Sequence, residues 1–213
     1  MFHWINCSDL SLPASKHIGR TKSRNLYKPV KPDQLWETDI TYIPTEFGIT
    51  YLMCIKDTFI REWQGYNYSM SCMARDDIRS VENAVLVAFN GTAPECLALR
   101  TDNGPQYISH EFRSAMKLLG IRLEYIQKHT PEDNGDTESF HNSIKTDYIW
   151  PNEFMGFHDA SIALGKAFTD YNECRPHSSI DYLPPKEFRR KFHDDPAFRE
   201  RFEKKEVEVR LNE

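Results

Sequence analysis

The sequence predicts an α/β fold built on a mixed five-stranded sheet flanked by helices. Three segments with alternating polar and apolar residues come first, and short apolar segments then alternate with helical patterns, in the order β-β-β-α-β-α-β-α-α. The 213 residues, of which 39% are hydrophobic and 13% aromatic, can bury one sizeable core. We divide the chain into a basic N-terminal arm or linker (1–32), a globular core (33–192) and a charged C-terminal tail (193–213).

The first three strands are predicted at Leu35–Ile43, Thr50–Lys56 and Trp63–Met70. Turn-forming residues at 44–48 join the first two as a hairpin. From 63 to 70 aromatic and polar side chains alternate, which suits a third antiparallel strand.

Helices and two shorter strands follow this antiparallel part. Asp76 or Asp77 can cap a helix whose apolar residues recur at helical spacing up to Phe89. Ser109 can cap the next helix, and Gly120 can stop it. The remaining predicted elements are strands at Glu95–Thr101 and Ile121–Ile126 and helices at about Asn134–Ile149 and Asp159–Asn172.

The composition excludes a membrane-spanning or disulfide-stapled protein. No run of about 18 apolar residues exists, and the N-terminus lacks a basic region followed by an apolar one. The five cysteines are odd in number and widely spaced, which is typical of a reducing compartment. We therefore expect a cytoplasmic protein without a membrane partner.

The net charge of −5 is unevenly distributed along the chain. Residues 1–31 hold six basic residues, among them Arg20, Lys22 and Arg24, against one acidic residue, so the rest of the chain carries −10. A basic arm on an acidic body can bind phosphate through the arm while the body holds metal. The alternative is an ordinary solvated leader, which charge alone does not exclude.

Three acidic residues stand out because their predicted positions converge. Asp39 lies in the alternating segment LWETDITYI, and Asp102 follows the buried strand that contains CLAL. Glu138 opens an amphipathic segment, and 35 residues separate it from Asp102. Carboxylates on two strands and a neighbouring helix would repel one another, but a bound divalent cation would turn this repulsion into attraction.

The predicted helix that begins near Glu138 has two distinct faces. Glu138, Asn142, Lys145 and Ile149 lie at i, i+4, i+7 and i+11, which aligns an acid, an amide and a cation on one face. A second face can pack on the sheet; it holds Phe140, Ile144 and Tyr148. Taken alone, a Glu–Lys pair at this spacing indicates a surface salt bridge, whereas its conjunction with Asp39 and Asp102 favours a site.

These motifs, in this order, resemble a known family. The segments TDNGPQY, NGDTESFHNSIK and NECRPHSSIDYLPPKEF, with the 35-residue gap, resemble the catalytic core of insertion-sequence transposases related to retroviral integrases. The resemblance covers about residues 33–190 and implies a ribonuclease-H-like fold, with which the predicted strand order agrees. It also implies that Asp39, Asp102 and Glu138 are catalytic acids and that Lys145 contacts DNA.

The resemblance implies a DDE-type polynucleotidyl transferase that cleaves and joins DNA strands. Three carboxylates suffice for two Mg²⁺ or Mn²⁺ ions, expected with DNA bound, which stabilise both the attacking and the leaving oxygen. The partners would be element ends and target DNA at the nucleoid, with a homo-oligomer formed on DNA. Asn142 and Asn103 can also contact DNA, although a turn role for Asn103 has equal support.

Two other functions remain open at this point. One is a metal-dependent nuclease of the same fold, which would cleave DNA without joining it. The other is a truncated, non-catalytic remnant that binds DNA or oligomerises. Full-length relatives usually carry a helix-turn-helix region ahead of the core, whereas about 30 residues precede it here. We therefore expect a truncated copy, an engineered fragment or one product of a divided gene.

Overall fold

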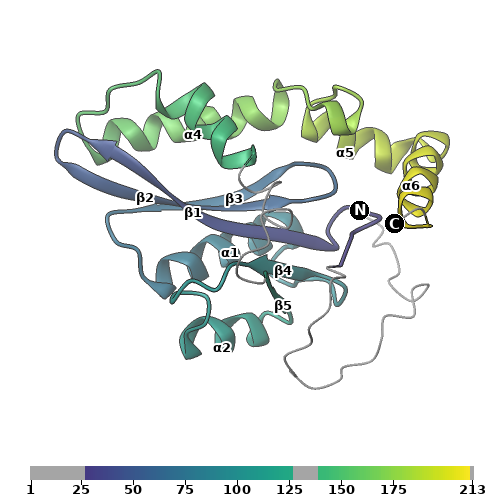
Figure 1. The fold of residues 1–213 in the computed structure, drawn as a ribbon, viewed down its shortest axis with the longest axis horizontal. Coiled ribbons are helices and arrows are strands. Elements are labelled where there is room, and N and C mark those ends of the chain that lie inside the picture. Colours follow the sequence, from purple (N-terminus) through teal and green to yellow (C-terminus); the bar gives the residue numbers. More distant parts are fainter. Residues whose placement is uncertain (1–26, 127–138, 212–213) are drawn as a thin grey trace.

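A computed structural model of the chain describes residues 27–126 and 139–211, with side chains up to residue 203. Arg20, Lys22, Arg24 and Glu138 therefore lie outside the described residues. Between these limits, a five-stranded sheet separates two layers of helices (Figure 1). None of the helices in the described ranges is both long and apolar enough to span a bilayer.

The sheet has the strand order β3-β2-β1-β4-β5 and mixes both pairing directions. β1 to β3 are antiparallel neighbours, whereas β4 runs parallel to β1 and β5 parallel to β4. The predicted fold class is therefore confirmed. β4 begins later than predicted because the Leu97 N–H donates to the Pro94 carbonyl in a turn at 2.9 Å. The strands are β1 (Leu35–Thr45), β2 (Gly48–Asp57), β3 (Trp63–Ser69), β4 (Ala98–Thr101) and β5 (Arg122–Tyr125).

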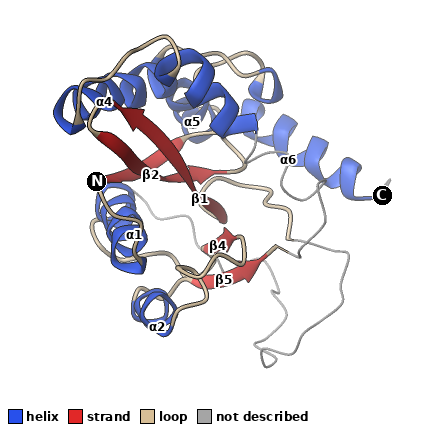
Figure 2. Cartoon of the chain, turned by 60° about the vertical axis from the view of Figure 1, so that its left-hand side comes forward, coloured by secondary structure: helices blue, strands red, loops and turns tan. Residues whose placement is uncertain are grey.

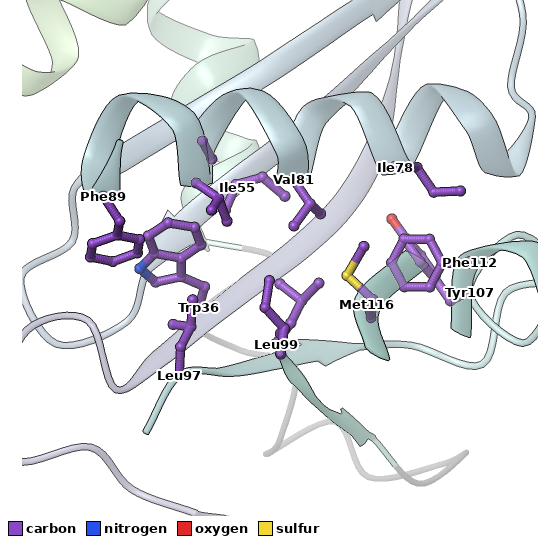
Figure 3. Close-up of a cluster of buried hydrophobic side chains, with 13 residues drawn as sticks. Trp36, Ile55, Ile78, Val81, Phe89, Leu97, Leu99, Tyr107, Phe112 and Met116 are labelled. Carbon is purple, nitrogen blue, oxygen red and sulfur yellow. The ribbon is translucent and has the colours of Figure 1, made fainter. Parts of the chain in front are cut away.

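Helices α1 (Ala74–Phe89) and α2 (His110–Leu118) cover one face of the sheet. Their predicted apolar residues are buried against the strands, and Trp36 of β1 stacks on Phe89 with ring centroids 5.3 Å apart (Figure 3). The Ser109 hydroxyl accepts the Phe112 N–H at 3.1 Å, so the predicted cap of α2 is confirmed.

The start of α1 differs from the prediction. The helix begins at Ala74, and Asp76 acts from inside its first turn, where its carboxylate accepts the Met73 N–H at 3.0 Å. Asp77 does not cap the helix, since its side chain is fully buried below the sheet and its oxygens have no hydrogen-bond partner of normal geometry among the described residues.

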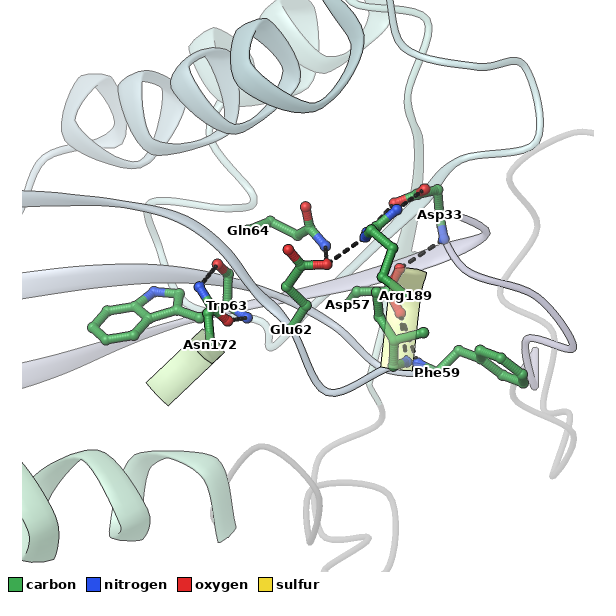
Figure 4. A network of polar contacts seen from close by, with 9 residues as sticks. Asp33, Asp57, Phe59, Glu62, Trp63, Gln64, Asn172 and Arg189 are labelled. Carbon is green, nitrogen blue, oxygen red and sulfur yellow. Dashed lines mark hydrogen bonds and ion pairs between the residues drawn. The ribbon is translucent and has the colours of Figure 1, made fainter. Parts of the chain in front are cut away.

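The other face is covered by residues 139–149 and by α4 (Phe157–Glu173) (Figure 2). Phe140 is buried as predicted and meets the Trp63 ring edge-on at 5.8 Å. The Asn172 side chain bonds both the N–H and the carbonyl of Trp63 at 2.9 Å, which ties α4 to β3 (Figure 4).

The chain then continues through η3 (Ser178–Ile180), α5 (Pro185–Asp194) and α6 (Pro196–Leu211). Arg189 of α5 pairs with Asp33 and Glu62, which fixes this helix to the end of the sheet (Figure 4). Phe202 of α6 lies in the segment that the sequence sets apart as a tail, yet its ring packs on Phe188 at 4.7 Å.

Four charged side chains, three of them buried and Glu124 half-buried, lie together on the sheet face covered by α4. Glu37 of β1 stands opposite Lys56 of β2 and Arg100 of β4, with ion-pair distances of 3.4 and 3.0 Å. Arg100 also pairs with Glu124 of β5 at 2.9 Å. Two acids and two bases cancel, so the cluster crosses four strands without a net charge.

Replacing Arg100 by Met should lower the free energy of unfolding by about 3–5 kcal/mol, because Glu37 and Glu124 both lose their ion pair with Arg100 while Glu37 stays buried. Urea denaturation measures this loss. Lys191→Met is the control, since Lys191 pairs with Glu187 on an exposed helix face and should cost less than about 1 kcal/mol. Equal losses in the two variants would contradict a structural role for the buried cluster.

Candidate active site

The structure brings Asp39 and Asp102 together at the end of β4. Glu37 of β1 lies opposite Arg100 of the parallel strand β4, and each acid is two residues further along. Residues two apart in a strand point to the same face. Both carboxylates therefore emerge on the face covered by residues 139–149 and α4.

The pKa of Asp39 is raised to about 6 by its surroundings. Burial is the largest cause and the negative charge of Asp102 adds to it, whereas the Ile40 N–H, which donates to Asp39 Oδ1 at 2.8 Å, opposes the shift. The Asp39 side chain keeps 35% of its surface exposed, so solvent screens part of this repulsion. A cation placed between the two carboxylates would offset the repulsion that solvent does not screen.

Asp102 is held by the tight turn that follows β4. The Gly104 N–H donates to Asp102 Oδ1 at 2.8 Å, and a Cβ on Gly104 would come within 2.9 Å of the same oxygen. Only glycine fits this approach without a shift of the carboxylate. The Asn103 amide donates to the Ile126 carbonyl, which ties this turn to the residue after β5, and a DNA contact by Asn103 stays a prediction.

The segment after Glu138 brings two of the predicted DNA-binding residues to the site. Asn142 is exposed and Lys145 is half-buried. The Lys145 charge lowers the pKa of Asp39, which places its ammonium on the active-site side of the segment. No carboxylate among the described residues forms an ion pair with Lys145, and Glu138 lies outside them.

The predicted alignment of Ile149 with Asn142 and Lys145 is wrong. The chain is α-helical at 139–144 but forms a π-helix, η2, at Lys145–Ile149, where the Trp150 N–H bonds the Lys145 carbonyl at 2.7 Å. The wider turn rotates Ile149 into the core, where it is 2% exposed.

His141 belongs to the site, although the sequence analysis did not select it. Its Nε2 lies 3.9 Å from Asp39 Oδ2 and its side chain is 8% exposed. The pKa of His141 is lowered to about 3, mainly by burial and also by the charges of Lys145 and Lys56, so the imidazole is neutral. A signal existed in the sequence, because His141 is at i+3 from Glu138 and so shares its face in the predicted helix.

Arg175, from the RPHSS segment, fixes the π-helical segment to the end of α4. Its guanidinium donates to Asp147 Oδ2 at 2.9 Å and to the Ser143 hydroxyl at 3.1 Å, and it lies over the Tyr171 ring. Arg175 lies outside the site and, through these bonds, fixes the helical segment that carries Lys145.

Asp77, one of the two acids predicted as a possible helix cap, is a further carboxyl near the site. Its pKa is raised to about 7, mainly by burial and also by the charges of Asp76, Asp39 and Asp102, while interaction with the Tyr107 hydroxyl opposes the shift. At neutral pH Asp77 is therefore protonated in part of the molecules, which reduces the negative charge behind Asp39.

The carboxylates of Asp39 and Asp102 fit a hard divalent cation, because Mg²⁺ and Mn²⁺ prefer oxygen ligands. The described residues contain no group of three side chains that is able to hold a metal ion. Glu138, the third predicted acid, lies outside the described residues, so its place in the site stays a prediction.

A groove of about 400 Å³ between η2 and α4 is separate from this site. Its lining includes Asp147, Glu153, Asp159 and Asp170, but neither Asp39 nor Asp102. These four acids would repel a phosphate, so the groove does not extend the candidate site toward DNA.

Comparison with known proteins identifies the family. Two family models, both described as integrase core domain, match residues 29–131 and 119–185. Together they span most of the chain, including Asp39, Asp102 and Glu138. The chain belongs to the integrase core domain family. The resemblance inferred from TDNGPQY and the later motifs is confirmed.

Within this family, the core is similar to insertion-sequence transposases. It is 34% identical over 165 residues to the transposase for insertion sequence element IS904 of Lactococcus lactis subsp. lactis strain IL1403, which covers 76% of this chain and 64% of that transposase. The chain spans 64% of the length of this transposase, 62% of an IS600 protein of Shigella sonnei and 55% of the IS3A transposase InsF of Escherichia coli strain K12.

Solved integrase structures share the fold of this core. A chain of the simian T-cell lymphotropic virus intasome, solved with the PP2A regulatory subunit B56 gamma, superposes with a TM-score of 0.65 at 22% identity, covering 81% of this chain and 58% of that one. The HTLV-2 integrase catalytic core domain, solved in complex with magnesium, gives 0.60 at 19% identity, covering 76% and 99%. The ribonuclease-H-like integrase core fold is thereby established.

The pKa of Asp39 makes the stability of the metal-free core depend on pH. The folded-state pKa of about 6 exceeds the usual 3.8, so the stability that protonated Asp39 contributes is complete below 3.8 and lost as pH rises through 6. Asp39→Asn should therefore stabilise the protein at pH 8 by about 1 kcal/mol, a figure discounted for solvent screening, and by nothing near pH 3.5. Urea titrations in EDTA across this range measure the difference.

Asp159→Asn is the matched control, because hydrogen bonds from Gly156 and Met155 lower the pKa of Asp159. That variant should lose stability at pH 8 rather than gain it. If Asp39→Asn raised the free energy of unfolding by the same amount at every pH, the charge of Asp39 would not be the cause of that increase.

Proposed function

We propose that this chain is the catalytic core of a DNA transposase that cleaves a phosphodiester bond at an element end and joins the freed 3′-hydroxyl to target DNA. The observation that carries the proposal is the register of β1 on β4, which puts Asp39 and Asp102, each two residues beyond the paired Glu37 and Arg100, on the same face of the sheet. Similarity to the IS904 transposase supports the same conclusion.

Asp39 and Asp102, together with Glu138, would hold the divalent cations that this reaction needs. Glu138 enters by its position in the family motif, since it lies outside the described residues. Two Mg²⁺ or Mn²⁺ ions would stabilise the attacking and leaving oxygens of an in-line displacement. The HTLV-2 integrase core with the same fold was solved with magnesium, which supports this choice of ion.

The residues of the chain supply the remaining parts of the reaction. Lys145, whose charge lowers the pKa of Asp39, and the exposed Asn142 of the same segment would bind the DNA backbone. Arg20, Lys22 and Arg24 would add contacts with phosphate that do not depend on sequence. We infer that a homo-oligomer assembles on element ends and target DNA, in the cytoplasm at the nucleoid.

A nuclease of the same fold would use the same acids, so product analysis decides between the two functions. The experiment incubates the protein with pre-nicked element-end DNA, a target plasmid and Mg²⁺ or Mn²⁺. Joined products support the transposase, whereas hydrolysis without joining supports the nuclease. Neither product would support the non-catalytic alternative.

Asp39→Asn, Asp102→Asn and Glu138→Gln should each reduce strand transfer by more than about 1000-fold, because a lost ligand removes several kcal/mol of charge stabilisation. Gel quantification of joined DNA measures the rate. Asp159→Asn, at the exposed start of α4, should retain the wild-type rate. A variant that keeps its activity would remove its acid from the catalytic set.

Lys145→Ala should weaken DNA binding and lower the slope of log affinity against log salt by about one unit, because one phosphate contact is lost. The Mg²⁺ requirement should not rise, since the Lys145 charge opposes a cation at Asp39. Fluorescence anisotropy across a salt series measures the slope. Lys166→Ala, an exposed cation that lines the acidic groove, is the control and should leave the slope unchanged. An altered thermal melt with an unaltered slope would exclude a phosphate contact by Lys145.

A further inference from the structure

His141 places a buried ring nitrogen against one oxygen of Asp39. Its Nε2 lies 3.9 Å from Asp39 Oδ2, and no described residue gives that nitrogen a hydrogen bond. The other Asp39 oxygen, Oδ1, already accepts the Ile40 N–H at 2.8 Å. Each carboxylate oxygen therefore has one protein group directed at it, from two different elements.

Packing fixes the His141 ring in this position. Its neighbour Phe140 is locked between Trp63 and Tyr171, with edge-on ring distances of 5.8 and 5.3 Å, and Ile144 is fully buried one turn further on. A buried polar atom without a partner is costly. A role in packing alone does not account for a nitrogen at this place, because an apolar side chain would fill the same space without that cost.

We propose that His141 is a positioning residue of the active site, whose Nε2–H donates to Asp39 Oδ2 and so orients the carboxylate toward the cation. The proposal rests on the function proposed above. A carboxylate offers about four lone-pair directions, so one donor on each oxygen leaves the others for metal. The present distance must shorten by about 1 Å, which is usual because catalytic hydrogen bonds often tighten only when the site is loaded.

Direct ligation of the metal by His141 fits the structure less well. Mg²⁺ takes oxygen ligands, and an imidazole would favour softer ions such as Zn²⁺ or Co²⁺. The described residues around Asp39 also include no set of three groups arranged to hold a metal. Groups that orient a metal-binding carboxylate from behind typically change metal affinity or activity by about 10–100-fold when removed.

The experiment compares His141→Leu, which removes the donor, with His141→Gln, which returns an N–H near the position of Nε2. Binding of Mn²⁺ to each protein without DNA is measured by electron paramagnetic resonance, and strand transfer is measured as a function of Mg²⁺ concentration. Leu should weaken Mn²⁺ binding and raise the Mg²⁺ midpoint by about 10–100-fold, whereas Gln should stay within about threefold of the wild type.

His177→Leu is the matched control. His177 also has a buried Nε2 without a hydrogen bond from any described residue, but its ring packs on Tyr171 and forms no ion pair with the described Asp39. That variant should change thermal stability and leave Mn²⁺ affinity unchanged. If His141→Leu does not fold, His141→Met, which is similar in volume and also lacks the donor, takes its place.

Wild-type Mn²⁺ affinity in the Leu or Met variant would overturn the proposal. The proposal would also be overturned if His141→Gln bound Mn²⁺ as weakly as His141→Leu while the wild-type protein preferred Zn²⁺ or Co²⁺ to Mn²⁺. That combination would mean that His141 ligates the metal directly. A wild-type protein that binds Mn²⁺ but joins no DNA would refute the proposed function and leave the His141 comparison readable. A wild-type protein that binds no Mn²⁺ would refute both.

Discussion

The ion pair between Glu37 and Arg100 fixes how β1 and β4 lie against each other. These strands are parallel and only a few residues of β4 take part, so few backbone hydrogen bonds define their register. A slip of one residue would send Asp102 to the opposite face of the sheet. Because Glu37 and Arg100 are both buried, such a slip would also leave charges unpaired in the core. The candidate site thus depends on the Glu37–Arg100 ion pair, which lies two residues before each of its acids.

The charges around the site are arranged so that repulsion is confined to one place. The buried cluster at Glu37 is neutral as a whole, and Asp77 on the far side of the sheet has a raised pKa. Unbalanced negative charge is therefore left at Asp39 and Asp102, on the surface that residues 139–149 border. A net acidic protein can in this way attract metal at one point while Lys145 and the basic arm meet DNA.

The sequence was sufficient to predict the five strands, the mixed sheet and the stripes of apolar residues, because alternation and helical spacing follow directly from burial. The sequence also pointed to Asp39 and Asp102, since Asp39 is an acid within a recognisable strand and Asp102 directly follows another. It did not predict the π-turn, which moves Ile149 without any change of pattern, nor the pairing of His141 with Asp39, which joins residues about 100 positions apart. Asp77 was assigned to a cap because its burial depends on the sheet above it, which spacing along one helix does not reveal.

The π-turn at Lys145–Ile149 has a consequence for how relatives of this chain align. A π-turn accommodates one residue more than an α-turn between the same fixed ends. The ends here are fixed, because Phe140 is locked in the core and Arg175 grips Ser143 and Asp147. A relative with a regular α-helix in this place would therefore be one residue shorter between Lys145 and the RPHSS segment. Such a one-residue gap would preserve the spacing from Glu138 to Lys145, and would mark a change of helix type rather than a change of the site.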